Sequence, residues 1–176
     1  YTYATARLLL HTIRKEVLGE EISHEAMASR YVTYFPEFIA KGIKNELLDE
    51  KLQQFDLARL GAALKPERDL KFDYLGLQTL FDRYFLHVRK QRIELPQALF
   101  MRVAMGLSLN EQNREERAIE FYEILSSFDF MSSTPTLFNA GTLRSQLSSC
   151  YLTTVADDLG GIYDAIKENA LLSKFA

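Results

Sequence analysis

Apolar residues in the first 128 positions recur at intervals of three and four, the period of one face of an α-helix. The first such stripe consists of Tyr3, Ala6, Leu10, Ile13 and Val17. Gly19 follows this stripe and is a natural C-terminal stop for a helix. The pattern therefore predicts an amphipathic helix that buries one face against a core.

Further stripes with the same period predict a series of helices. They are Met27, Tyr31, Tyr34 and Phe38, interrupted near Pro36; Leu48, Leu52 and Phe55; a short helix from the capping residue Asp56 to Leu64; Tyr74, Leu77, Phe81, Tyr84 and Val88; Leu99, Val103 and Leu107 after Pro96; and Ala118, Phe121, Leu125 and Phe128. We interpret residues 65–71 as a loop and residues 110–115 as a charged turn. Because helical spacing alone explains the aromatic residues, we interpret them as core packing.

The pattern changes after Phe128. Serine, threonine, proline, glycine and asparagine replace the helical period, and residues 146–155 are compatible with a β-strand. Thr134 precedes Pro135, which favours an extended backbone at the threonine, and residues 139–141 form a plausible tight turn. This part of the chain therefore predicts a strand-rich linker.

A last helix is predicted after this linker, with Asp157 or Asp158 as its cap. Its apolar side would carry Leu159, Ile162 and Ile166. The order of the elements predicts a mainly α N-terminal helical domain in residues 1–128. Residues 129–176 would then form the first strand–helix unit of an α/β barrel that is incomplete in this chain.

Composition narrows the classes of function. The net charge is −3, and lysine and arginine form no basic block, so nothing favours a nucleic-acid partner. No apolar run approaches the roughly 20 residues of a membrane span. The single cysteine excludes an internal disulfide and suits a reducing cytoplasm. Since the chain of 176 residues opens on Tyr1 and stops within a predicted helix, we interpret it as a piece of a longer protein.

Cys150 is the residue with the clearest chemical potential. In a strand it would share one face with Gln146 and Ser148. A buried cysteine is usually a small apolar residue of the core. However, the hydroxyls of Ser148, Ser149 and Thr134 are good donors to a ribose or a phosphate and would be costly if unpaired in a dry core. The residues alone leave both interpretations open.

Other catalytic classes find less support. A cysteine-dependent hydrolase or transferase would need a distant base, because no histidine follows His87. His11, His24 and His87 lack metal-ligand spacing, and neither GxxxxGK nor GxGxxG is present. A further alternative is a non-enzymatic helical interaction module in which Cys150 only packs.

Several motifs together resemble the large (α) subunit of class I ribonucleotide reductases. MSSTPTLFNAGT followed by RSQLSSC is similar in residue types and in the spacing from Thr-Pro to Cys. DYLGLQTLFDRYF and ELPQALFMRVAMGL resemble the N-terminal helical domain of that family. The likeness runs from about Ser23 to the end of the chain. It implies a fragment of a ribonucleoside-diphosphate reductase that covers the helical domain and the start of the ten-stranded catalytic α/β barrel.

The resemblance also implies roles for particular residues. Thr134 and Ser149 match residues that contact the substrate, and so does Cys150. Cys150 also matches one of two redox-active cysteines that supply reducing equivalents for loss of the 2′-hydroxyl, and its disulfide partner would lie outside this chain. The segment that binds a deoxynucleotide effector corresponds to Asp157, Asp158 and Leu159. Either aspartate could instead be a helix cap only.

The partners implied by the resemblance are those of a complete reductase. The substrate would be a ribonucleoside diphosphate, the effectors ATP or deoxynucleoside triphosphates, and the reductant thioredoxin or glutaredoxin. A second large subunit would pack against an exposed stripe at Ile162 and Ile166. The dimetal radical cofactor would lie in the small subunit, so this chain would bind no cofactor. Because the other essential cysteines are absent, the chain alone is expected to be inactive.

Overall fold

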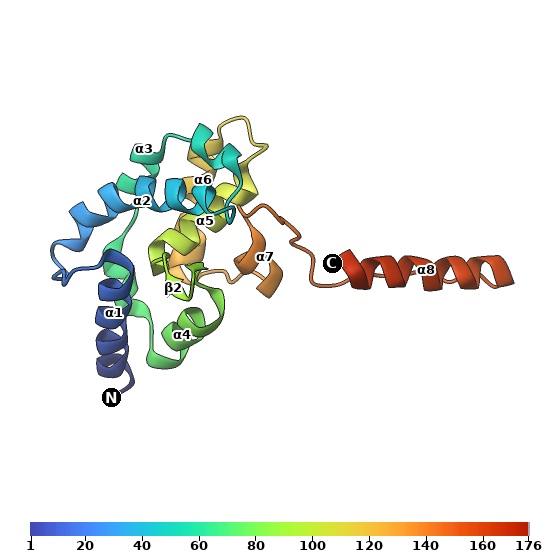
Figure 1. The fold of residues 1–176 in the computed structure, drawn as a ribbon, viewed down its shortest axis with the longest axis horizontal. Helices are drawn as coiled ribbons and strands as arrows, with labels where there is room; N and C mark the ends of the chain where they lie inside the picture. The colour runs from blue at the N-terminus through green and yellow to red at the C-terminus, as the bar shows by residue number, and fades with distance from the viewer. Residues whose placement is uncertain (176) are drawn as a thin grey trace.

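The structure is a computed structural model that describes residues 1–175, and it consists of a helical body from which the last helix projects (Figure 1). In chain order the elements are α1 (Thr2–Leu18), α2 (Met27–Lys44), η1 (Glu50–Gln54), α3 (Leu57–Ala62), η2 (Pro66–Lys71), α4 (Tyr74–Thr79), η3 (Leu80–Tyr84), β1 (His87–Val88), β2 (Gln91–Arg92), α5 (Pro96–Ser108), α6 (Arg114–Ser127), α7 (Thr134–Asn139) and α8 (Leu159–Phe175). The elements η1 and η2 are 3₁₀ helices, and η3 is a π-helix.

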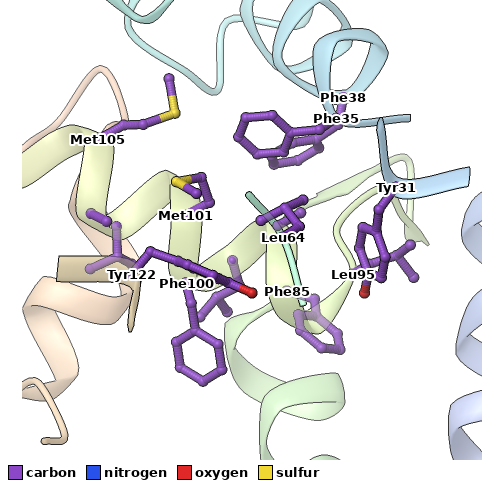
Figure 2. Close-up of a cluster of buried hydrophobic side chains, with 14 of the residues drawn as sticks. Tyr31, Phe35, Phe38, Leu64, Phe85, Leu95, Phe100, Met101, Met105 and Tyr122 are labelled. Atoms are coloured by element: carbon purple, nitrogen blue, oxygen red, sulfur yellow. The ribbon is translucent and has the colours of Figure 1, made fainter. Parts of the chain in front are cut away.

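Helix α5 lies at the centre of the body. Pro96 occupies its first turn, as predicted, and the helix packs against α6, η2 and α7. Side chains from α5 face the aromatic residues of α2 and Tyr122 of α6 in one contiguous apolar core (Figure 2). Leu99 and Val103 are buried as predicted, whereas Leu107 is 39% exposed. The core therefore forms around a helix that is covered on most of its sides.

A buried polar network ties five elements together around Asp69. The Asp69 carboxylate accepts hydrogen bonds from Arg14 Nη2 and Gln97 Nε2, each at 2.8 Å, and from the Tyr31 hydroxyl at 3.2 Å. The hydroxyl of Tyr122 donates to Gln97 Oε1 at 2.7 Å. Burial raises the pKa of Tyr31 well above its usual value, so this hydroxyl remains a neutral donor. The network joins α1, α2, η2, α5 and α6.

The long helix predicted from Tyr74 to Val88 is confirmed as far as Tyr84 and is wrong beyond that residue. Helix α4 continues into η3 and ends at Tyr84, and the chain then forms an antiparallel hairpin in which Val88 pairs with Gln91. The turn residues between these two, Arg89 and Lys90, have φ values of +49° and +70°. A contact with α1, which is distant in the sequence, holds this hairpin. The backbone N–H of Arg92 in β2 donates a hydrogen bond to Glu16 Oε1 of α1. Tertiary contacts therefore override the apolar period here.

Three smaller predictions also need correction. Pro36 lies inside α2 without interrupting it, because apolar residues on both sides of the proline pack into the same core. The helix predicted around Leu52 is only the 3₁₀ turn η1, and the loop predicted at residues 65–71 contains η2. By contrast, α1 and its stop at Gly19, which has φ +75°, are confirmed.

The helical part of the predicted fold is confirmed, but the predicted strand at residues 146–155 does not form. Within residues 1–175 the only sheet is the β1–β2 hairpin. The backbone N–H and C=O groups of a strand form hydrogen bonds with a neighbouring strand, and the described residues supply no such neighbour for this segment.

Within residues 1–175, no helix is both long enough and apolar enough to cross a membrane.

Candidate functional site

The Thr-Pro motif begins the short helix α7. Ser133 is extended, with φ −62° and ψ 157°, and Pro135 lies in the first turn, where a helix does not need its missing N–H. Thr134 is already helical, so the extended conformation predicted for it occurs one residue earlier. The predicted tight turn is confirmed, because α7 ends at Asn139 and Gly141 adopts φ +77°.

Tyr84 contacts the side chain of Thr134. The phenol oxygen lies 3.2 Å from Thr134 Oγ1, and the ring stacks on Phe138 with the centroids 4.5 Å apart. Tyr84 is the last residue of η3, and π-helical turns often occur at functional sites. In the sequence, Tyr84 is only one member of an apolar stripe. Nothing in that stripe indicates a contact with a residue fifty positions away.

A buried ion pair lies at the other end of α7. Arg102 Nε donates to Glu94 Oε1 at 2.7 Å, and both side chains are 0% exposed. The guanidinium also donates to the carbonyl oxygens of Leu137 at 3.0 Å and Ala140 at 2.7 Å. Neither Glu94 nor Arg102 was predicted from the sequence as a site residue. The one available signal was the presence of a single arginine within the apolar run of α5.

Thr134 and Ser149 line one pocket of about 440 Å³. Its full lining is Thr134, Pro135, Phe138, Asn139, Gln146, Ser148, Ser149 and Tyr151. The segment after α7 is held near the helix because Asn139 Nδ2 donates to the Gln146 carbonyl oxygen at 2.7 Å. The structure therefore brings together two of the three residues predicted to bind the substrate.

Cys150 follows Ser149 and is exposed, but it does not line this pocket. Within the described residues, Cys150 therefore does not pack in the apolar core. The alternation of faces that a strand would impose is also absent. Instead, Gln146 Nε2 donates to the carbonyl oxygen of Ser148 at 2.9 Å, which is a local contact within the irregular segment. The thiol is accessible from solvent, as redox chemistry with an external partner requires.

Thr134 also lines a second, larger pocket of about 660 Å³. Its lining is mainly apolar and comprises Tyr3, Lys71, Phe72, Asp73, Leu75, Gly76, Thr79, Leu80, Tyr84, Phe100, Phe128, Met131, Ser132, Thr134 and Leu137. The hydroxyls of Ser132, Thr134 and Tyr84 are among the polar groups of this lining. Thr134 thus lines both this mainly apolar pocket and the pocket that contains Ser149.

The residues predicted to bind an effector lie apart from α7, because α8 projects from the helical body (Figure 1). Asp158 Oδ1 accepts a hydrogen bond from Gly161 N at 2.9 Å, which confirms the predicted helix cap. Asp157 is exposed, and Leu159 is 72% exposed. The predicted exposed stripe is present and consists of Ile162 and Ile166. The structure therefore does not unite these residues with Thr134 in one site.

The described residues contain no group of three or more histidine, cysteine, aspartate or glutamate side chains arranged to hold a metal ion. The candidate site consequently rests on hydroxyls, one thiol and backbone groups. Such groups can bind a sugar or a phosphate by hydrogen bonding, and the thiol can exchange electrons with another sulfur.

Comparison with known proteins gives a consistent relationship. A family profile described as the all-alpha domain of ribonucleotide reductase matches residues 70–145. The chain is 48% identical over 176 residues to the ribonucleoside-diphosphate reductase subunit alpha of Chlamydia trachomatis, covering 100% of this chain and 17% of that relative. Its identity to the subunit alpha of Helicobacter pylori is 43%, covering 99% and 21% of the two chains. Its identity to the large subunit of Danio rerio is 37%, covering 100% and 22%. The chain thus spans about a fifth of the length of these relatives.

Proposed function

This chain belongs to the ribonucleotide reductase family as the N-terminal all-alpha region of a large subunit, and from this premise we propose that it forms one wall of the substrate site of a ribonucleoside-diphosphate reductase. The observation that carries the proposal is the meeting of Thr134 and Ser149 in one pocket, which the polar side chains of Asn139, Gln146 and Ser148 also line. Their hydroxyls would donate to the ribose or the diphosphate of the substrate. The complete enzyme would convert ribonucleoside diphosphates to 2′-deoxyribonucleoside diphosphates for DNA precursor synthesis.

Cys150 would take part in the reduction itself. A neutral thiol can protonate the departing 2′-hydroxyl, which leaves as water. The two electrons come from Cys150 and a second cysteine outside this chain, and the two sulfurs become a disulfide. Thioredoxin or glutaredoxin would then restore the thiols. The exposure of Cys150 supports this proposal, because a partner sulfur must reach it.

Substitution of the hydroxyls tests the substrate site. In the complete large subunit, assayed with its small subunit, Thr134→Val and Ser149→Ala should each raise the KM for the ribonucleoside diphosphate by on the order of tenfold. Ser145→Ala is the matched control, because Ser145 is exposed nearby and does not line the pocket. Unchanged KM values in both pocket variants would contradict the proposal.

Cys150→Ser separates a reductase from a cysteine-dependent hydrolase or transferase. In a reductase it should block turnover with dithiol and leave radical formation in the small subunit possible. In a hydrolase it should abolish a covalent acyl intermediate. The isolated chain should not reduce nucleotides under any of these conditions, because it holds only one of the cysteines that the reaction needs.

Asp157, Asp158 and Leu159 would contact a deoxynucleoside triphosphate or ATP effector, with a second large subunit packed against α8. The dimetal radical cofactor would reside in the small subunit, and the reducing cytoplasm would be the compartment of this chemistry.

Asp157→Asn is the cleaner test of the effector site, since Asp158 also caps α8. It should change which effector promotes which substrate, and Asp164→Asn on the same helix should not.

The exposed stripe on α8 also favours a second candidate, a helical interaction module without catalytic function. The two candidates differ in one measurable property. A module would show no dependence on nucleotides, whereas the reductase fragment in its complete subunit binds both substrate and effector.

A further inference from the structure

The C-terminal end of α7 is held by one buried side chain. Helix α7 has six residues, and so short a helix is not stable by itself. The last carbonyl groups of a helix also lack partners within it. Arg102 Nη1 donates to the carbonyl oxygens of Ala140 at 2.7 Å and Phe138 at 3.4 Å, and Nη2 donates to that of Leu137 at 3.0 Å. A single guanidinium therefore satisfies three carbonyls at this helix end.

Glu94 orients that guanidinium. Its two carboxylate oxygens accept hydrogen bonds from Arg102 Nε at 2.7 Å and from Nη2 at 3.3 Å. Glu94 therefore fixes the orientation of the planar guanidinium, whose remaining N–H groups bind the end of α7. Glu94 Oε2 also accepts from the backbone N–H of Leu86 at 3.0 Å. Leu86 lies two positions beyond Tyr84 in the chain. The same ion pair consequently holds the backbone next to Tyr84 and the end of α7.

Close backbone packing leaves α7 little freedom against α5. A Cβ atom on Gly106 of α5 would overlap the backbone nitrogen of Gly141, and one on Gly141 would lie 3.0 Å from the Arg102 carbonyl oxygen. At the other end of α7, the Tyr84 hydroxyl meets Thr134 Oγ1. The position of Thr134 is therefore set by contacts at both ends of its helix.

We propose that Arg102, oriented by Glu94, is a positioning residue for substrate binding: it fixes α7 so that the Thr134 hydroxyl faces the pocket that Ser149 also lines. This inference rests on the proposed function of Thr134. A lysine cannot replace the arginine, because one ammonium group cannot bond three carbonyls and two carboxylate oxygens in a planar fork. Arg102→Lys should therefore keep the charge next to Glu94 and release the end of α7.

The body of the protein offers a matched control in its other buried ion pair. Arg14 donates to Asp69 at 2.8 Å, their side chains are 7% and 0% exposed, and no hydrogen bond connects this pair to α7. Arg14→Lys disturbs an equally buried pair and should lower stability in a similar way. A purely structural role of Arg102 would make the two lysine variants alike in their kinetics.

The experiment measures KM and kcat for a ribonucleoside diphosphate in the complete large subunit with its small subunit. Arg102→Lys should raise KM by on the order of tenfold and change kcat by less than about threefold, whereas Arg14→Lys should leave KM unchanged. Combined with Thr134→Val, Arg102→Lys should add no further rise in KM, because both changes remove the same contact. If Arg102→Lys does not fold, Glu94→Gln, which keeps the shape of the pair, takes its place and should raise KM in the same direction.

The outcomes separate this inference from the function on which it rests. If Thr134→Val raises KM and the Arg102 or Glu94 variant does not, the positioning role is wrong and the proposed function stands. An equal rise in KM in Arg14→Lys would also overturn the positioning role, since the effect would then be general. If Thr134→Val itself leaves KM unchanged, the proposed function fails first.

Discussion

The helical body up to residue 147 and the segment from residue 148 to 174 both carry large apolar side chains, but only the body buries them. Phe35 and Leu60 in the body are 0% exposed, whereas Leu152 is 101% exposed and Tyr163 is 65% exposed in the later segment. The body finds its apolar partners within this chain. The large apolar side chains of the later segment have no such partners among the described residues. Its apolar period alone therefore did not produce a packed structure.

The later segment also shows which elements form without partners. Helix α8 forms because the backbone hydrogen bonds of a helix lie within the helix itself. The strand predicted just before it does not form, because the hydrogen bonds of a strand lie on its neighbour. The difference shows that a helix can form in a segment that lacks tertiary partners, whereas a strand cannot.

The largest expected effect is the loss of the buried carboxylate of the body. Asp69→Ala leaves Arg14 as an unpaired buried charge and removes the acceptor of Tyr31 and Gln97, so the free energy of unfolding should fall by about 3–5 kcal/mol. Urea denaturation of this chain, followed by circular dichroism, measures the change. Asp164→Ala, on exposed α8, is the control. Similar losses of stability in both variants would contradict the difference in burial between the body and α8.

A matched pair of leucines tests the same distinction with identical chemistry. Leu60→Ala creates a cavity in the core and should lower the free energy of unfolding by about 2–5 kcal/mol. Leu152→Ala should change it by less than about 0.5 kcal/mol. Urea denaturation compares the two variants directly. A loss above about 1 kcal/mol for Leu152→Ala would mean that the later segment packs against the body in solution.

The smallest expected effect depends on pH and concerns Glu123 of α6. Burial raises the pKa of Glu123, but hydrogen bonds from Lys65 at 2.6 Å and from Arg68 outweigh this effect and lower the pKa below its usual value. Because the folded pKa lies below the unfolded one, the stabilisation is present above the unfolded pKa and is lost as the pH falls through the folded pKa.

Glu123→Gln should therefore lower the free energy of unfolding by less than about 1 kcal/mol near pH 7. The difference from the unsubstituted chain should shrink as the pH falls through the folded pKa of Glu123. Urea denaturation over a series of acidic pH values, compared with pH 7, measures it, with Glu168→Gln on α8 as the control. A difference that grows on acidification would contradict the direction of the pKa shift.

Short sequence motifs correctly predicted the helix starts, stops and caps that depend only on residues close by in the sequence. The stop of α1 at Gly19, the start of α5 at Pro96 and the cap of α8 by Asp158 are confirmed. The Asp56 cap is also confirmed, since its Oδ1 accepts from Arg59 N at 3.0 Å. Each of these features satisfies or removes a backbone group within one turn of helix, so a few residues are enough to specify it.

The candidate site was predictable only in part. Thr134 and Ser149 were identified through motifs and do share a pocket, but Tyr84 and Arg102 were missed. The apolar period that contains Tyr84 predicted a longer helix, and the tertiary contacts of the hairpin ended it. A residue that acts on another element through a folded contact leaves no periodic signal in its own segment.

By itself, the sequence determined that this is a helical chain with most of its caps and breaks in place, and that a Thr-Pro motif and a Ser-Ser-Cys motif follow the helices. These properties depend on spacing and on backbone hydrogen bonds closed over a few residues. Only the tertiary structure decided that a buried arginine of α5 holds the helix of Thr134, and that the segment around Cys150 stays irregular. Both outcomes depend on which distant groups are present to accept or donate a hydrogen bond, and a linear pattern does not contain that information.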